Sequence, residues 1–397
     1  MTGRLEAAGS AAAPPSAGRR ERIRRVREQM AHVGVDALLL SHGADLPWLT
    51  GYRAMPLERL TMFVLRTDAD PVLLVPALEA PRVADSHGLF EVRAWNETED
   101  PVELVARLLP SGARAASSAA GRGEHATYAV SDRAWAQTLI ALQGRLPTAR
   151  WMPASTVTSP LRAVKDAEEI AVLRAAAAAA DSVARALQAG EVEVVGRTEE
   201  AVSAEIAARL VAAGHRRVNF SIVGSGPNGA SPHHDASGRL IGPGDTVVCD
   251  FGGEFPSPDG VAYCSDITRT VSVGDPSPEV DDCYAVLEAA QAAAVAAVAP
   301  GVTAEHVDAV ARQMIADAGF GDFFIHRTGH GIGIEEHEDP YIVAGNGTPL
   351  VPGHAFSIEP GIYFPGRFGM RLEDIVVVCE DGVDPLNRVD HSLAVVA

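Results

Sequence analysis

The sequence contains almost no lysine. Lysine and arginine together number 33 among 397 residues, and Lys165 is the only lysine. A Schiff-base enzyme or a phosphate-binding loop of the GxxxxGK type would therefore have to use Lys165. That residue stands in AVKDAEE, at an expected helix start and not after a glycine-rich turn. The sequence thus argues against lysine-dependent chemistry, and Lys165 is predicted to be structural.

Positive charge is scarce as well. Aspartate and glutamate number 52, so the formal net charge is −19. Such a surface repels polyanions, and we expect neither a nucleic acid nor an anionic membrane as a partner. Charged residues interrupt the Ala-rich stretches, and no run approaches the ~18 apolar residues of a membrane span. Cations are better matched to this chain.

Paired cysteines are missing. Cys249, Cys264, Cys283 and Cys379 form no CxxC pair, which excludes a zinc knuckle and a dithiol redox motif. Reduced thiols are typical of a cytoplasmic protein. Residues 1–18 are rich in Ala, Ser and Pro and lack the apolar stretch of a signal peptide, so we expect a disordered tail there.

The remaining chain is expected to form two domains. Residues 19–156 combine a helical pattern with short apolar runs such as DALLL, TMFVL and PVLLV, which is typical of a small α/β domain. Residues 157–397 contain helices and strands in blocks, which indicates an α+β domain. Four helix N-caps are expected in this second domain: Asp166, Thr198, Ser277 and Thr303.

A glycine-rich string at 224–229 satisfies the GxGxxG spelling of a dinucleotide-binding loop. However, Pro227 lies inside it, and SPHHDASG follows where a helix should begin. Because the motif requires that helix, the dinucleotide interpretation fails. We expect instead a loop that delivers His233.

Four acids and one histidine interrupt strand-like runs in the C-terminal half. They are Asp250, Asp266, His330, Glu359 and Glu373. Each acid alone could face solvent, but ionised carboxylates inside strands are costly to bury without a cation. One shared site explains all five positions, whereas the alternative requires a separate explanation for each. Four carboxylates and a neutral imidazole sum to −4, which two divalent ions would cancel, so the sequence predicts a dinuclear metal site.

The same residues carry a resemblance to a known family. The strings CDFGGEF, YCSDITRTVSVG, HRTGHGIGIEEHEDPYI, FSIEPGIY and RLED resemble the signatures of the pita-bread metallopeptidases, which include methionine aminopeptidase, Xaa-Pro aminopeptidase and prolidase. The string RIRRVREQMAHVGVDALLLSHGADLPWLTGY resembles the creatinase-type N-terminal domain of the proline-specific branch. The resemblance implies a pita-bread catalytic domain of the α+β class at 157–397, preceded by a creatinase-type α/β domain at 19–156.

The resemblance also implies a role for each residue of the metal site. Asp250 would bind one ion, His330 and Glu359 would bind the other, and Asp266 and Glu373 would bridge both. Glu359 would in addition be the proton acceptor and donor of the reaction. The oxygen-rich ligand set favours Mn²⁺, with Co²⁺, Fe²⁺ or Zn²⁺ as other occupants.

Further residues match the family's substrate-contacting positions. His233 and His337 are expected to contact the substrate and stabilise an oxyanion. His326 and Arg371 are expected to orient the metal-binding carboxylates.

The spacing between Asp250 and Asp266 is longer than is usual in the family. The additional sequence, FPSPDG, consists of turn-forming residues, so we expect it to enlarge a hairpin tip and leave both ligands in register.

The expected reaction is hydrolysis of the bond before proline in short peptides. Tyr341 stands where some prolidases carry an arginine for the dipeptide carboxylate, which favours an Xaa-Pro aminopeptidase. Because Arg327, Arg367 or Arg371 could bind that carboxylate instead, an Xaa-Pro dipeptidase is the alternative. Methionine aminopeptidase generally lacks the N-terminal domain.

A creatinase-like hydrolase without metal and a non-catalytic binding module are less favoured, because all five ligands are retained. The resemblance further implies a homodimer.

Overall fold

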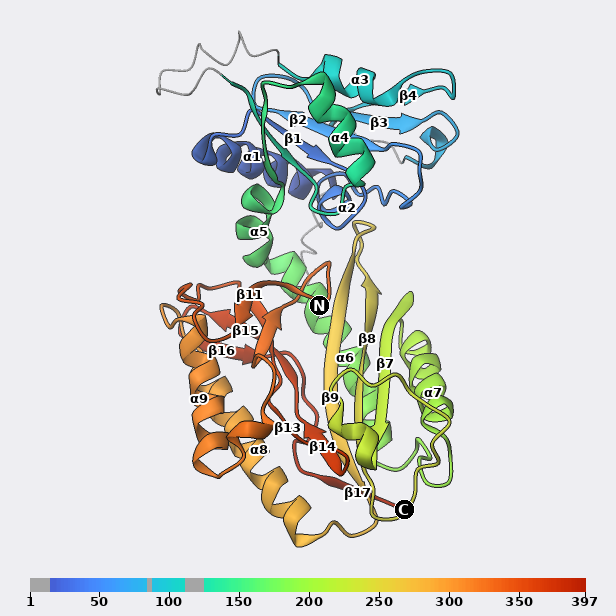
Figure 1. Cartoon of the computed structure of the whole chain (residues 1–397), viewed down its shortest axis with the longest axis vertical. Helices are drawn as coiled ribbons and strands as arrows, with labels where there is room; N and C mark the ends of the chain where they lie inside the picture. Colours follow the sequence, from blue (N-terminus) through green and yellow to red (C-terminus); the bar gives the residue numbers. More distant parts are fainter. Residues whose placement is uncertain (1–14, 84–87, 111–124) are drawn as a thin grey trace, which may run out of the picture. The chain divides into compact units, whose positions relative to one another are not determined.

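The structure is a computed structural model that describes residues 15–83, 88–110 and 125–397 (Figure 1). The chain forms two compact units that divide between Leu161 and Arg162, slightly after the expected boundary at 156. Of the expected tail at 1–18, residues 1–14 lie outside the described part, and α1 (Pro15–Val33) includes the other four. Among the described residues, no helix combines the length and the apolar character that a membrane span requires.

The N-terminal unit is built on a mixed six-stranded sheet with the order β4-β3-β2-β1-β5-β6. Its strands are β1 (Ala37–Leu40), β2 (Met62–Arg66), β3 (Val72–Pro76), β4 (Glu91–Trp95), β5 (Thr127–Val130) and β6 (Arg150–Pro153). Its helices are α1, α2 (Asp45–Thr50), α3 (Pro101–Leu108) and α4 (Ala136–Arg145), with a short 3-10 turn at η1 (Ala80–Arg82). The chain passes from the first unit to the second within α5 (Ser155–Ala163). Strand β1 is central and buried along its whole length, which explains why it is a continuous apolar run and not an alternating one.

The first half of the C-terminal unit packs α6 (Ala167–Gln188) and α7 (Glu199–Ala212) against a sheet with the order β17-β9-β8-β7. The strands are β7 (Arg217–Ser225), β8 (Thr246–Pro256), β9 (Ala262–Val273) and β17 (Ala394–Val396). In β8, Val247, Cys249 and Phe251 join the same core as the two helices. Because side chains alternate along a strand, Asp250 lies on the opposite face.

The second half packs α8 (Pro278–Ala296) and α9 (Ala304–Asp317) against a five-stranded sheet with the order β11-β10-β12-β15-β16. These strands are β10 (Gly329–Gly331), β11 (Glu338–Ile342), β12 (Ala355–Ile358), β15 (Asp374–Cys379) and β16 (Gly382–Pro385), and β13 (Gly361–Phe364) pairs separately with β14 (Phe368–Arg371). A 3-10 turn, η4 (Gly321–Phe323), follows α9. Figure 1 shows the strands of this unit between the two pairs of helices, and the expected α+β class is confirmed.

Local sequence signals explain where the long helices begin. At the start of α6, the Asp166 side chain accepts a hydrogen bond from the backbone N–H of Glu169, and the Glu169 side chain accepts one from that of Asp166. Thr198 and Ser277 cap α7 and α8. Thr303 precedes α9 as expected, but its side chain makes no capping hydrogen bond.

The additional residues between Asp250 and Asp266 lie in the tip of the β8–β9 hairpin. The ladder continues without interruption to the Pro256–Ala262 pair, so the tip comprises 257–261, and the first two residues of FPSPDG lengthen β8. Asp250 pairs with Thr268, two residues after Asp266, and all three side chains therefore share one face. The longer spacing leaves both acids in register.

Candidate metal centre

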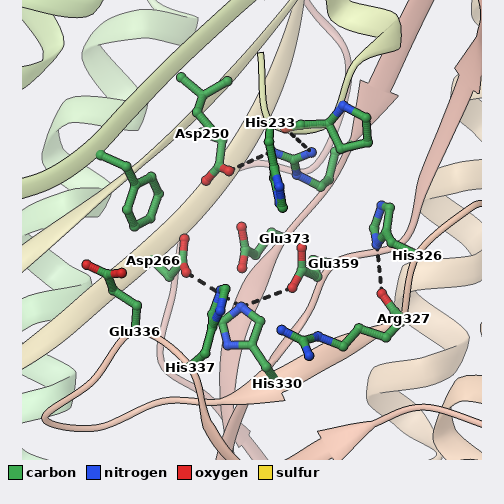
Figure 2. A pocket seen from close by; sticks show the side chains of 14 residues that line it. His233, Asp250, Asp266, His326, Arg327, His330, Glu336, His337, Glu359 and Glu373 are labelled. Carbon is green, nitrogen blue, oxygen red and sulfur yellow. Dashed lines mark hydrogen bonds and ion pairs between the residues drawn. The ribbon is translucent and has the colours of Figure 1, made fainter. Parts of the chain in front are cut away.

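A cavity of about 500 Å³ in the C-terminal unit brings the expected ligands together. Its lining includes Asp250, Asp266, His330, Glu359 and Glu373. Figure 2 shows these side chains converging on the cavity. Asp250, Asp266 and His330 come from β8, β9 and β10, whereas Glu359 directly follows β12 and Glu373 directly precedes β15, so these two acids flank strands and do not interrupt them. Four further residues with expected roles also line it: His233, His326, His337 and Arg371. Tyr341 is the exception, because it is not among the lining residues.

Glycines on both sides of His330 allow its strand to lie deep in the sheet. A Cβ atom at Gly329 would come within 1.8 Å of the Ser357 carbonyl oxygen, and one at Gly331 within 2.2 Å of that of Asp339. Only glycine permits this close approach. The backbone N–H of His330 donates to Ser357 Oγ at 3.0 Å, which fixes the histidine at the edge of the cavity.

Three candidate ligands form a compact group. One donor atom each from Asp266, His330 and Glu373 lie within 4.8 Å of one another. His330 Nε2 is 3.9 Å from Asp266 Oδ2 and 3.1 Å from Glu359 Oε1. All of these side chains are buried or nearly so. The spacing and the donor types suit a divalent cation.

Two of these carboxylates, those of Asp266 and Glu373, form no ion pair with an arginine or lysine of the described residues. Burial raises the pKa of Asp266 well above its ordinary value, and the charges of Glu373, Asp250 and Glu359 raise it further. Burial and neighbouring carboxylates raise the pKa of Glu373 in the same way. Among the described residues, Asp250 Oδ1 and Glu373 Oε1 are buried atoms without a hydrogen-bond partner. Buried oxygens without a partner are costly, so the donor set fits bound cations.

Glu359 differs from the other acids. Burial alone would raise its pKa, but the hydrogen bond to His330 and the charges of His330, His326 and Arg371 lower it to about 2. Ser357 Oγ also donates to Glu359 Oε1 at 3.0 Å. Glu359 therefore keeps its negative charge at neutral pH and can accept a proton.

Arg371 is buried beneath the acids and supports them. Its Nη2 donates to Asp250 Oδ2 at 2.5 Å and its Nε to Thr268 Oγ1 at 3.1 Å. The Thr268 hydroxyl donates to Glu373 Oε2 at 2.7 Å. Sequence reasoning missed Thr268, although its position two residues after Asp266 in one strand places it on the same face.

Tyr363 connects two residues that were expected to orient the ligands. Its hydroxyl accepts a hydrogen bond from Arg371 Nη1 at 2.9 Å and lies 2.9 Å from His326 Nε2. Burial raises the pKa of Tyr363 to about 12, so the hydroxyl keeps its proton. Sequence reasoning missed this residue, because a buried aromatic in a strand has the same pattern as a core residue.

The two histidines expected to contact substrate both line the cavity. His233 follows the short 3-10 turn η3 (Gly226–Ala230), where no dinucleotide-binding helix forms. The ring of His337 lies 4.1 Å from that of His330, centroid to centroid. Burial, together with the charges of His330 and Arg327, lowers the pKa of His337 to about 4, so its imidazole is neutral near pH 7.

Apart from the expected ligands, two charged side chains of the lining form no ion pair within the described part of the chain. Arg327 stacks on Tyr341, with its guanidinium carbon 4.5 Å from the ring centroid. Glu336 is half-buried and lies on the Asp266 side of the cluster in Figure 2. Arg327 had been named from the sequence as one candidate carboxylate-binding residue, whereas Glu336 was missed, since it stands in an acidic run that resembles a solvated turn.

Fold and site together define a metallopeptidase. Residues 171–380 match the model of metallopeptidase family M24, and residues 22–164 match the creatinase/prolidase N-terminal domain. The chain belongs to this family, and the expected pita-bread fold with its creatinase-type N-terminal domain is confirmed.

Individual relatives are similar over nearly their whole length. The chain is 46% identical over 369 residues to a protein named probable dipeptidase PepE from Mycobacterium tuberculosis. The matched residues cover 92% of this chain and 93% of the relative. It is 36% identical over 366 residues to an Xaa-Pro dipeptidase from Lactobacillus helveticus, covering 91% and 95%. The crystal structure of dipeptidase PepE from Mycobacterium ulcerans superposes with a TM-score of 0.86 at 45% identity, covering 99% of this chain and 100% of that one.

Proposed function

We propose that this protein is a dinuclear-metal Xaa-Pro dipeptidase. The observation that carries the proposal is the set of buried, uncompensated carboxylates in a chain of the M24 family. Relatives named dipeptidase and Xaa-Pro dipeptidase support the dipeptide substrate. They favour the alternative raised from the sequence over the aminopeptidase that Tyr341 suggested.

The five carboxylate and imidazole side chains would hold the two ions. Asp250 would bind one, His330 and Glu359 the other, and Asp266 and Glu373 would bridge them. This oxygen-rich set makes Mn²⁺ the first choice, with Co²⁺, Fe²⁺ or Zn²⁺ as other occupants. When bound, such ions polarise the scissile carbonyl and lower the pKa of water.

The protein's own groups would move the protons and stabilise the charge. Glu359, which is anionic at neutral pH, would accept the proton of the attacking water and return it to the leaving proline nitrogen. Neutral His337 can donate one ring N–H toward the developing oxyanion, and His233 lies in the same lining. Arg371 would hold Asp250, while Tyr363 links Arg371 to His326.

Arg327 is the arginine best suited to bind the carboxylate of a dipeptide. Arg371 is engaged by Asp250, and Arg367 pairs with Glu279 and does not line the cavity. Arg327 lines the cavity, and its guanidinium is held against the Tyr341 ring. Tyr341 would thus act indirectly, by supporting the arginine and not by contacting the substrate.

The proposal is tested by assaying metal-stripped protein, with and without added Mn²⁺, on Ala-Pro and on Ala-Pro-Ala-Ala. We expect hydrolysis of Ala-Pro only when metal is present, and little cleavage of the tetrapeptide. Hydrolysis of neither substrate with any of the four metals would contradict the peptidase assignment. Equal cleavage of both substrates would restore the aminopeptidase.

A pair of variants tests the dipeptide subsite. Arg327→Gln should lower kcat/KM for Ala-Pro by roughly 10- to 150-fold, because a hydrogen bond to a charged group contributes about 1.5–3 kcal/mol. Arg367→Gln removes an arginine outside the cavity and is the matched control. Equal effects of the two substitutions would exclude Arg327 as the carboxylate partner.

A further inference from the structure

Glu336 is a carboxylate of the cavity that has no place in the proposed ligand set. It lies between β10 and β11, within an acidic run that also contains Glu335 and Glu338. Arg162 pairs with both of these neighbours, and Lys165 Nζ lies 3.2 Å from Glu338 Oε2. Glu336 instead lines the cavity, where no cation of the described residues meets it.

The surroundings of Glu336 combine negative charge with apolar surface. Phe220 and Ile222, both from β7, line the same cavity. Figure 2 shows Glu336 beside Asp266, and its charge acts on the nearby Cys264 thiol, whose pKa burial already raises. A cavity whose lining combines these apolar side chains with a carboxylate suits a side chain with an aliphatic stem and a cationic end.

The position of Glu336 indicates which residue of a dipeptide it would meet. Arg327 and Glu336 lie on opposite sides of the carboxylate and histidine cluster in Figure 2. With the dipeptide carboxylate on Arg327 and the scissile bond at the cluster, the N-terminal residue extends toward Glu336. This orientation rests on the proposed dipeptidase function.

We propose that Glu336 selects dipeptides whose N-terminal residue is cationic, so that Lys-Pro and Arg-Pro are preferred over neutral Xaa-Pro substrates. The Glu336 carboxylate accepts charge-assisted hydrogen bonds from the ammonium or guanidinium group of that side chain. A fully exposed ion pair contributes little, but the half-buried cavity screens this one less. We expect a preference of about tenfold in kcat/KM.

The test compares Lys-Pro with norleucine-Pro, whose side chain has a similar length but no charge, and with Glu-Pro. Each is assayed with the Mn²⁺-loaded wild-type protein, Glu336→Gln and Glu336→Arg. The wild-type ratio of Lys-Pro to norleucine-Pro should be about ten, and it should fall to about one in Glu336→Gln. Glu336→Arg should prefer Glu-Pro. Asp339→Asn, which removes an exposed acid three positions away and outside the cavity, should keep the wild-type ratio.

Each other outcome has a distinct meaning. A wild-type ratio near one, or an unchanged ratio in Glu336→Gln, would overturn this inference while leaving the dipeptidase intact. Equal losses for Lys-Pro and norleucine-Pro would mean that Glu336 binds the α-ammonium group, which also overturns it. Failure of the wild-type protein to cleave any Xaa-Pro dipeptide would contradict the proposed function itself and this inference with it. If one Glu336 variant does not fold, the other decides, because each should lower the ratio of Lys-Pro to norleucine-Pro.

Discussion

Buried carboxylates occur in two different settings in the C-terminal unit. Burial would raise the pKa of Glu338 and of Glu199, but protein partners lower both to about 2. In the cavity, burial and neighbouring acids raise the pKa of Asp266 and Glu373. The same chemical group is thus satisfied from within the protein in one setting and left without a counter-charge in the other. The two settings therefore distinguish acids that stabilise the fold from acids for which we propose an external cation.

The satisfied acids lie next to the two histidines that we propose contact the substrate. Glu199 accepts hydrogen bonds from the Ser225 backbone and hydroxyl and from Ser237, and it lies 2.9 Å from His234 Nε2, beside His233. Together these bonds anchor the loop that carries His233 to the start of α7.

Glu338 is similarly fixed by Arg162 and Lys165, and it follows His337 directly. The only lysine is therefore structural, as predicted. Both satisfied carboxylates can position a histidine without touching substrate.

The largest expected effect comes from neutralising a cavity acid. Asp266→Asn should lower kcat for Ala-Pro by more than about a thousandfold, because the proposed bridging ligand would be lost. The metal-free variant should unfold at the same temperature as the metal-free wild type or higher, since an uncompensated buried charge has been removed. Thermal unfolding with EDTA and with Mn²⁺ measures both states. Wild-type activity in this variant would contradict the metal assignment.

Breaking a satisfied pair should have the opposite effect on stability. Lys165→Met should lower the free energy of unfolding by about 3 kcal/mol in metal-free protein, because Glu338 loses a buried counter-charge. Urea unfolding measures the change. If Lys165→Met lowers the free energy of unfolding no more than Asp266→Asn does, the two kinds of buried carboxylate do not differ in how they affect stability.

Glu199→Gln should reduce stability in a pH-dependent manner. The pKa of Glu199 is about 2 in the folded protein and about 4.3 in the unfolded chain. The charged carboxylate therefore stabilises the fold fully at pH values above the unfolded pKa. This stabilisation is lost as the pH falls toward 2. The difference from wild type, about 2 kcal/mol at pH 7, should therefore shrink at pH 3 in urea titrations. A difference that stays constant between these pH values would contradict the assigned pKa.

The smallest effect is expected at an exposed pair. Arg367 and Glu279 form an ion pair in which both side chains are about half exposed. Arg367→Gln should change the free energy of unfolding by less than about 0.5 kcal/mol, because solvent screens such pairs. A change as large as that of Lys165→Met would show that burial does not determine these energies.

Much of the site could be predicted, because the alternation of side chains along a strand identifies the residues that face away from the core. An acid that interrupts an apolar run, as Asp250 does in TVVCD, must leave the core face, and the hairpin register brings it opposite Thr268. The insertion could be placed in the turn from its Pro, Asp and Gly residues.

Sequence could not distinguish the two kinds of acid. Glu338 stands in an acidic run and Glu199 in a helix start, and their partners are distant along the chain, 173 residues away for Lys165 and 26 for Ser225. Compensation depends on these long-range contacts. The sequence likewise left Arg327, Arg367 and Arg371 open as partners of the dipeptide carboxylate. Choosing Arg327 depends on the lining of the cavity and on the contact with the Tyr341 ring, which no local pattern reveals.

The central claim is that the unsatisfied acids bind two divalent ions. Isothermal titration of metal-stripped protein with Mn²⁺ tests it most directly, with Asp266→Asn and Lys165→Met titrated in parallel. We predict two Mn²⁺ ions per chain for the wild type and for the folded Lys165→Met variant, and loss of this stoichiometry in Asp266→Asn. No binding by the wild type, or the same two-ion binding by Asp266→Asn, would contradict the account.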